Sequence, residues 1–229
     1  MLSLPSTADK PRYVAAMFGR IADRYDLMNT LMTAGQDSAW RSAVAGSLGQ
    51  PARVLDVGTG TARLAATIAR ALPTAQVIGA DFSEPMLRAS RELVPLTAAD
   101  ALRLPFADDC FDAVVSGFLL RNLADVSAGI AEQARVLRPG GGLVVLETTP
   151  GPRAGWLRWL FQLYFRRLVP LVGGLVAGDA AAYTYLPEST LAFLEPERLA
   201  ALMRAIGLEV VSIRRLALGS VAVTVARKR

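Results

Sequence analysis

A guanidinium and a carboxamide stand directly after a strongly apolar stretch of this chain. The residues FDAVVSG at 111–117 predict a buried strand, and the apolar FLL follows before Arg121 and Asn122. Open α/β sheets bind ligands at the carboxyl ends of their strands, so both side chains are placed to meet one. Arg121 would stabilise negative charge forming on a substrate oxygen, and Asn122 would orient a hydroxyl group or a water molecule. In a structural alternative, Arg121 pairs with an acid such as Asp125 and Asn122 caps the following helix.

A glycine-containing loop between an expected strand and an expected helix is the second candidate. The stretch VLDVGTGTARLA places Asp56 ahead of Gly58 and Gly60. Glycines let a backbone approach a ligand closely, and a helix N-terminus offers free N–H groups. The dinucleotide fingerprint G-x-G-x-x-G requires a third glycine where this chain has Arg63, which disfavours a dehydrogenase.

An acid, Asp81, ends the next expected strand along the chain. After a glycine loop, a carboxylate in this position can accept two hydrogen bonds from a ribose diol. The alternative is a helix cap, because an expected helix over SEPMLRASREL follows at once. The loop upstream favours the ribose-binding role.

The elements that would position these residues alternate along the middle of the chain. Expected strands at 53–57, 76–81, 96–99, 111–117 and 142–148 alternate with expected helices at 61–71, 83–93 and 126–141. Continuous apolar runs in the strands favour a parallel sheet covered on both faces. A helix at 195–207 precedes strands at 208–218 and 220–228, which must pair antiparallel because only Gly219 separates them.

This α/β arrangement, a mostly parallel seven-stranded sheet with a C-terminal antiparallel hairpin, resembles the Rossmann-like fold of S-adenosylmethionine-dependent methyltransferases. We expect one methyltransferase domain over residues 1–229. Its expected parts are an N-terminal helical cap at 1–48, a cofactor-binding core at 49–150, an inserted helical cap at 151–190, and the final helix and hairpin at 191–229. By resemblance, Asp100 would meet the adenine amino group and the backbone of Ala101 would meet the ring; alternatively, Asp100 is a solvated loop acid.

Missing residue types restrict the chemistry. Histidine is absent and Cys110 is the single cysteine, which argues against most metal sites and against Ser-His-Asp or Cys-His mechanisms. We expect Cys110 to be a structural thiol in a reducing compartment. The formal net charge of +5 comes almost entirely from arginines spread along the chain, so we expect no nucleic-acid partner. The N-terminus lacks the apolar core of a signal peptide and no apolar run reaches about 20 residues, so we expect a cytoplasmic location.

Residues 156–178 combine tryptophans and leucines with interspersed arginines. This composition suits an element that lies at a membrane surface, and it predicts a peripheral position on the inner face of the cytoplasmic membrane. The alternative is a cap helix whose tryptophans pack on the core.

Four motifs in order give a more specific resemblance. The stretches YDLMNTLMTAGQDSAW (25–40), LRNL (120–123), RVLRPGGGLVVLETT (135–149) and AYTYLPEST (182–190) are similar to the ubiquinone/menaquinone C-methyltransferase family. The resemblance implies methyl transfer from S-adenosylmethionine to a ring carbon of a prenylated quinol, either demethylmenaquinol or a demethylated ubiquinol precursor. It adds Thr61 and Gly117 to the expected cofactor contacts. The expected substrate-pocket residues are Tyr25, Asn29, Tyr183, Tyr185 and Ser189. For the Tyr183–Tyr185 pair, packing in the core is the alternative.

The chain departs from the family pattern at several positions. The family usually has serine where this chain has Thr33, and histidine where it has Asp37. Its glycine loop usually reads A-G-G-T-G-D, whereas this chain has Ala62 and Arg63 at the last two places. Arg138 and Thr149 replace a lysine and a serine of the second signature. The change at Asp37 leaves the choice of quinone open.

Two other functions remain compatible with these residues. One is a methyltransferase that acts on another phenolic, sterol or lipid acceptor. The other is an inactive protein that binds the cofactor and interacts with partners. A homodimer is also compatible with the sequence.

Overall fold

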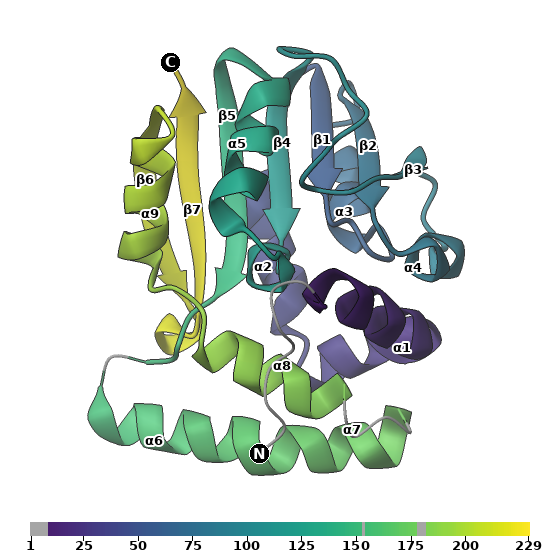
Figure 1. Ribbon diagram of the computed structural model, residues 1–229, viewed down its shortest axis with the longest axis vertical. Coiled ribbons are helices and arrows are strands. Elements are labelled where there is room, and N and C mark those ends of the chain that lie inside the picture. The colour runs from purple at the N-terminus through teal and green to yellow at the C-terminus, as the bar shows by residue number, and fades with distance from the viewer. Residues whose placement is uncertain (1–8, 153, 178–181) are drawn as a thin grey trace.

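Seven strands form one sheet at the centre of the computed structural model (Figure 1). The structure describes residues 9–152, 154–177 and 182–229. The strands are β1 (Arg53–Val57), β2 (Gln76–Asp81), β3 (Leu96–Ala98), β4 (Phe111–Gly117), β5 (Leu137–Thr148), β6 (Leu208–Leu216) and β7 (Val221–Lys228). Their spatial order is β3-β2-β1-β4-β5-β7-β6, and β7 runs antiparallel to both of its neighbours. The predicted α/β fold, with a mostly parallel sheet and a C-terminal antiparallel pair, is confirmed.

Helices cover both faces of the sheet. They are α2 (Gln36–Ala45) and α3 (Arg63–Ala71) on one face, and α5 (Val126–Val136) and α9 (Pro196–Ala205) on the other, while α4 (Glu84–Ala89) lies near the β3 edge. Each face has its own buried apolar cluster. Val54 of β1 packs in the α3 cluster and its neighbour Leu55 packs in the α5 cluster, because successive strand side chains point to opposite faces.

A second group of helices lies beyond the carboxyl ends of the parallel strands, and we call it the cap (Figure 1). It consists of α1 (Lys10–Met32), α6 (Gly155–Leu163), a π-helical turn η2 (Tyr164–Leu168), α7 (Val169–Ala177) and α8 (Ala182–Leu191). The cap has its own apolar cluster, in which Met17 and Ile21 of α1 meet Tyr183 of α8. Segments far apart in the sequence therefore close over one end of the sheet.

Element ends differ from the predictions where backbone chemistry intervenes. The expected helix at 126–141 ends at Val136, and Leu137 already begins β5. Pro139 cannot donate a helical hydrogen bond and Gly140 has a φ of +77°, so the helix cannot continue through these residues and ends before them. The expected helix at 83–93 ends at Ala89. Two short 3-10 turns, η1 (Leu120–Asn122) and η3 (Ala217–Gly219), were not predicted.

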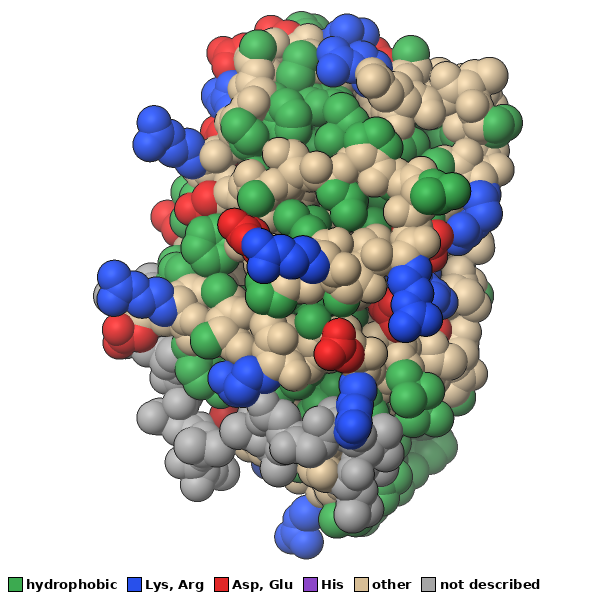
Figure 2. Space-filling model, turned by 90° about the vertical axis from the view of Figure 1, so that its right-hand side faces the viewer, with side chains coloured by type: hydrophobic (Ala, Val, Ile, Leu, Met, Phe, Trp, Pro, Cys, Tyr) green, Lys and Arg blue, Asp and Glu red, His purple; other side chains and the backbone are tan. Residues whose placement is uncertain are grey.

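Charges are dispersed over the face shown in Figure 2. Lysine and arginine side chains lie singly on it, with acidic side chains among them, rather than in a continuous stripe. In the part of the chain that the structure describes, no helix is long and apolar enough to cross a membrane.

Candidate functional site

Two neighbouring cavities open at the carboxyl ends of β1, β2 and β4. The larger has a volume of about 520 Å³ and the smaller about 130 Å³. Residues shared by both linings are Tyr25, Gly58, Gly60, Gly117 and Phe118. An elongated ligand can therefore fill the smaller cavity with one end and reach into the larger cavity with the other.

The glycine loop connects β1 to α3 at the junction of the two cavities. Gly58 and Gly60 have φ angles of +71° and +56°, a conformation that glycine adopts without steric cost. A Cβ atom on Gly58 would lie 2.7 Å from Cδ1 of Leu119, so only glycine lets the loop pass this close to the segment after β4. Oγ1 of Thr61 donates a hydrogen bond to Asp26 of α1 at 2.7 Å, which ties the loop to the cap.

Asp56 lies buried beneath this loop and lines the larger cavity. Its Oδ2 accepts hydrogen bonds from the Thr59 hydroxyl at 2.7 Å and the Ala65 N–H at 3.0 Å. Its Oδ1 has no hydrogen-bond partner among the described residues. Burial raises the pKa of Asp56 to about 7 in spite of the two hydrogen bonds. A cationic group on a ligand would meet an unpaired carboxylate oxygen here and would favour the ionised form.

We expect Asp56 to make the stability of the ligand-free protein depend on pH. Its pKa is about 7 in the folded chain and about 3.9 in an unfolded chain, so the folded state holds the extra proton between these values. The free energy of unfolding therefore falls as the pH rises through this window, and the loss persists above it. Thermal melting at about pH 5 and about pH 8 measures the effect. The Asp56→Asn variant should lose less stability than the wild type between the two pH values, and an equal loss would contradict the prediction.

Three residues that the sequence assigned to cofactor binding line the smaller cavity and not the larger one: Asp81, Asp100 and Ala101. Asp81 accepts the N–H of Gly60 through Oδ2 at 2.7 Å and the N–H of Ser83 through Oδ1 at 2.8 Å. Ser83 rather than Asp81 occupies the N-cap position of α4, so the helix-cap alternative for Asp81 is wrong. Burial raises the pKa of Asp81. The lining of the smaller cavity also includes apolar side chains, among them Met86 and Leu102.

Arg121 and Asn122 lie in η1, directly after β4, and each is only 8% exposed. Nη1 of Arg121 forms an ion pair with Oε1 of Glu147 at 2.6 Å and donates a hydrogen bond to the Phe118 carbonyl at 3.1 Å. Arg121 lines the larger cavity, and its Nε has no hydrogen-bond partner among the described residues. Arg121 therefore does pair with an acid, but not with Asp125. Asp125 instead caps α5, the role that the structural alternative gave to Asn122.

Asn122 connects the turn after β4 to the cap. Its Nδ2 donates to the Phe118 carbonyl at 3.0 Å, and its Oδ1 accepts a hydrogen bond from the Tyr185 hydroxyl at 3.3 Å. Asn122 lines the smaller cavity rather than the larger one. The neighbouring residues Arg121 and Asn122 thus face different cavities.

Helix α8 contributes to the site differently from the sequence prediction. Tyr183, Tyr185 and Ser189 are buried, but none of them lines either cavity. Tyr183 instead packs in the apolar cluster of the cap. Leu186 and Thr190, one helical turn apart, line the larger cavity, because that face of α8 is turned toward it. The predicted residues of α1, Tyr25 and Asn29, do line it.

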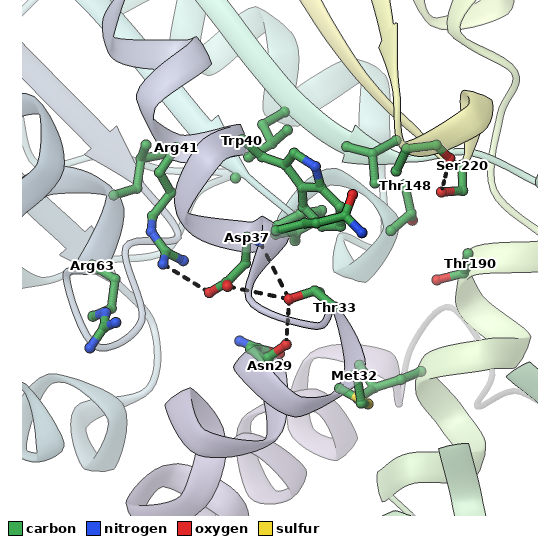
Figure 3. A pocket seen from close by; sticks show the side chains of 18 of the residues that line it. Asn29, Met32, Thr33, Asp37, Trp40, Arg41, Arg63, Thr148, Thr190 and Ser220 are labelled. Atoms are coloured by element: carbon green, nitrogen blue, oxygen red, sulfur yellow. Dashed lines mark hydrogen bonds and ion pairs between the residues drawn. The ribbon is translucent and has the colours of Figure 1, made fainter. Parts of the chain in front are cut away.

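The loop between α1 and α2 forms a polar part of the larger cavity's wall (Figure 3). Oδ2 of Asp37 forms an ion pair with Nη2 of Arg41 at 2.8 Å. Oγ1 of Thr33 lies 3.2 Å from Oδ1 of Asp37 and donates a hydrogen bond to the Asn29 carbonyl at 2.8 Å. Trp40, which follows Asp37 by three residues on α2, also lines the cavity.

Sequence reasoning missed Glu147 as the partner of Arg121. The signal was available, because Glu147 stands near the carboxyl end of a buried strand, as Arg121 does. The sequence also did not indicate that Trp40 and Arg41 line the larger cavity. Among the described residues, no group of three or more His, Cys, Asp or Glu side chains is arranged to hold a metal ion.

Comparison with known proteins gives matches over nearly the whole chain. A family model described as the ubiE/COQ5 methyltransferase family matches residues 6–228. A demethylmenaquinone methyltransferase from Deinococcus radiodurans is 47% identical over 208 residues, which cover 87% of this chain and 86% of the relative. A ubiquinone/menaquinone biosynthesis C-methyltransferase UbiE from Desulfotalea psychrophila is 45% identical over 217 residues, 92% of this chain and 88% of the relative.

A solved structure supports the same assignment at the level of the fold. An S-adenosylmethionine-dependent methyltransferase from Thermotoga maritima matches 93% of this chain and 99% of its own, with a TM-score of 0.70 and 20% sequence identity. At that identity the likeness concerns the fold alone. The sequence matches go further, and together with the fold they show that this chain is an S-adenosylmethionine-dependent methyltransferase that belongs to the ubiE/COQ5 methyltransferase family.

Proposed function

We propose that this enzyme methylates a ring carbon of demethylmenaquinol, with a demethylated ubiquinol precursor as the related alternative acceptor. The observation that carries the proposal is the buried Arg121 on the wall of a cavity of about 520 Å³ that adjoins the smaller cavity, where Asp81 and Asp100 lie. The relatives from Deinococcus radiodurans and Desulfotalea psychrophila, a demethylmenaquinone and a ubiquinone/menaquinone methyltransferase, support the acceptor class.

The residues of the two cavities fit the methyl donor. Asp81 would accept hydrogen bonds from the ribose diol, while Asp100 and the backbone of Ala101 would hold the adenine. The unpaired Oδ1 of Asp56 suits the ammonium group of the amino-acid portion. Thr61, on the glycine loop, lines the larger cavity beside that portion. When bound, the cofactor supplies an electrophilic methyl group on a sulfonium.

Arg121 would supply electrostatic stabilisation to the acceptor. A ring carbon beside a hydroxyl becomes nucleophilic as that hydroxyl loses its proton, and negative charge then develops on the oxygen. The guanidinium of Arg121 would donate a hydrogen bond to this oxygen from the cavity wall, while Glu147 holds it through Nη1. Asn122 would orient a hydroxyl group or a water molecule at the junction with the smaller cavity.

Tyr25 and Asn29 would bound the acceptor from the side of the cap. Burial raises the pKa of Tyr25, so its hydroxyl stays protonated near neutral pH and can donate a hydrogen bond. The chain has no histidine, so no imidazole can donate a hydrogen bond to the acceptor in place of Tyr25.

The cap also offers a route to a membrane-embedded acceptor. Trp156, Trp159, Leu160 and Leu163 recur at i, i+3, i+4 and i+7 on α6, and all four are exposed; the tryptophans are 68% and 63% exposed. The other side of the same segment lines the larger cavity, through Phe161, Tyr164, Phe165 and Val169. An apolar chain could therefore pass from the cavity to this outer stripe. Exposed arginines in the segment, Arg158, Arg166 and Arg167, favour contact with an anionic surface.

We expect the wild-type protein to sediment with vesicles that contain anionic lipid. The Trp156→Ser/Trp159→Ser variant should lower the partition coefficient about tenfold or more, because two aromatic groups can no longer insert. Leu93→Ser is a matched control, since Leu93 is fully exposed but lies outside the cap. Absence of wild-type sedimentation would refute a peripheral membrane position, whereas equal sedimentation of all three proteins would refute the role of the two tryptophans.

Methyl transfer from labelled S-adenosylmethionine to reduced short-chain demethylmenaquinol tests the proposed function. Label in the ring of the organic product would support it. Absence of label, with cofactor binding measured separately, would redirect attention to other phenolic or lipid acceptors. Cofactor binding without turnover on any acceptor would instead indicate an inactive binding protein.

A further inference from the structure

Three carboxylates from the described part of the chain line the larger cavity: Asp26, Asp37 and Asp56. Asp26 is engaged by Thr61 of the glycine loop. Asp56 lies beneath that loop, on the side that the proposed function gives to the methyl donor. Asp37 comes from α2, on the wall formed by the α1–α2 segment, and none of the roles above uses it.

The carboxylate of Asp37 is buried and held by neighbouring side chains, unlike the carboxylates of surface acids. Its residue is 5% exposed, its Oδ2 is paired with Arg41, and its Oδ1 lies near the Thr33 hydroxyl. It also stands in the first turn of α2, where the helix dipole favours a negative charge. Each carboxylate oxygen can accept a further hydrogen bond, because each carries about two lone pairs.

Two aromatic rings in the cavity lining, Trp40 and Phe118, connect the helix that carries Asp37 to Arg121. Trp40, on the same helix as Asp37, meets the ring of Phe118 edge-on, with 6.2 Å between ring centroids. The guanidinium carbon of Arg121 lies 5.4 Å from the centroid of the same Phe118 ring. All four side chains belong to the cavity lining. A flat bicyclic ring on this surface, with oxygens at opposite ends, can direct one oxygen to Arg121 and the other to Asp37.

The two redox forms of such a ring differ in what they offer to Asp37. A quinol presents hydroxyl groups, which donate hydrogen bonds, whereas a quinone presents carbonyl oxygens, which only accept. A carboxylate also only accepts, so it binds the quinol and leaves a quinone oxygen facing a negative charge. Resting on the proposed function, we infer that Asp37, positioned by Arg41 and Thr33, selects the reduced form of the acceptor.

Binding of two redox-related probes tests this inference without turnover. Naphthalene-1,4-diol and 1,4-naphthoquinone are titrated calorimetrically, without oxygen, into protein saturated with S-adenosylhomocysteine. All proteins carry Cys110→Ser, because naphthoquinones add to thiols and Cys110 is the only one. The otherwise unaltered protein should bind the diol at least about tenfold more tightly than the quinone, as expected for a hydrogen bond to a charged acceptor.

The Asp37→Asn variant should reduce this ratio to about two or less, because the carboxamide can donate to a quinone oxygen. Asp23→Asn, an exposed change on α1, should leave the ratio unaltered. A ratio that Asp37→Asn does not change would overturn the inference while leaving the proposed function in place. Failure of both probes to bind would overturn both.

A second variant keeps the test open if Asp37→Asn no longer binds S-adenosylhomocysteine. Thr33→Val removes the hydroxyl that accepts the backbone N–H of Asp37 at 3.4 Å and lies 3.2 Å from Oδ1 of Asp37, and it leaves the ion pair with Arg41. It should lower the diol-to-quinone preference about threefold, the effect of losing one neutral positioning hydrogen bond. An unchanged preference in this variant would count against Asp37 as the selecting group.

Discussion

Replacing Arg121 with alanine is expected to lower turnover by at least about 100-fold while leaving the affinity for S-adenosylmethionine nearly unchanged. The reason is that Arg121 does not line the smaller cavity, where the adenosine would bind, and its charge would act on the acceptor in the larger cavity. Single-turnover rates with reduced demethylmenaquinol, and cofactor titrations by calorimetry, measure the two quantities separately.

Variants of Glu147, the ion-pair partner of Arg121, can separate the effect of the Arg121 charge from the effect of disturbed packing. Arg121→Ala leaves a buried carboxylate without its partner, and a loss of activity could then reflect disturbed packing. Glu147→Gln keeps the guanidinium and removes its counter-ion, so it should retain turnover within a few-fold. The Arg121→Ala/Glu147→Gln double variant should be as slow as Arg121→Ala. If Glu147→Gln alone were equally slow, the ion pair as a structural unit, and not the charge of Arg121, would be what turnover requires.

The second large effect is expected at Asp81. Asp81→Ala should weaken the binding of S-adenosylhomocysteine by about 100-fold, because two hydrogen bonds from the ribose diol to a carboxylate would be lost. Calorimetric titration gives this value directly. Asp108→Ala serves as a matched control, since Asp108 is an exposed acid whose surface ion pair with Arg135 contributes little.

A ligand without the diol separates a direct contact from an effect on the loop. Asp81 also accepts the N–H groups of Gly60 and Ser83, so its loss can disturb the loop without any ribose contact. The 2′,3′-dideoxyribose analogue of S-adenosylhomocysteine should bind the wild type weakly, and Asp81→Ala should weaken it little further. Equal losses for both ligands would mean that Asp81 shapes the loop only.

Local sequence features determined the order and type of the main elements. Continuous apolar runs and their flanking turn residues predicted all seven strands, and the boundaries of β1, β2 and β4 agree with the structure. The glycine loop was also predictable from local sequence, because glycine adopts positive φ angles at no steric cost, as Gly58 and Gly60 do here. The family was predicted from contiguous motifs, and the comparisons confirm it. The roles of individual site residues stay predictions.

Only the tertiary structure decided which side chains share a wall. Glu147 reaches Arg121 from the adjacent strand β5, and Asp37 and Trp40 reach the same cavity from α2. The sequence named Tyr183 and Tyr185 for that cavity, yet Leu186 and Thr190 line it. The rotation of α8 about its own axis depends on how its apolar side chains pack against other helices, here the preceding helix α7 and the distant helix α1. A motif gives the residues of a helix, whereas packing decides which of them face the ligand.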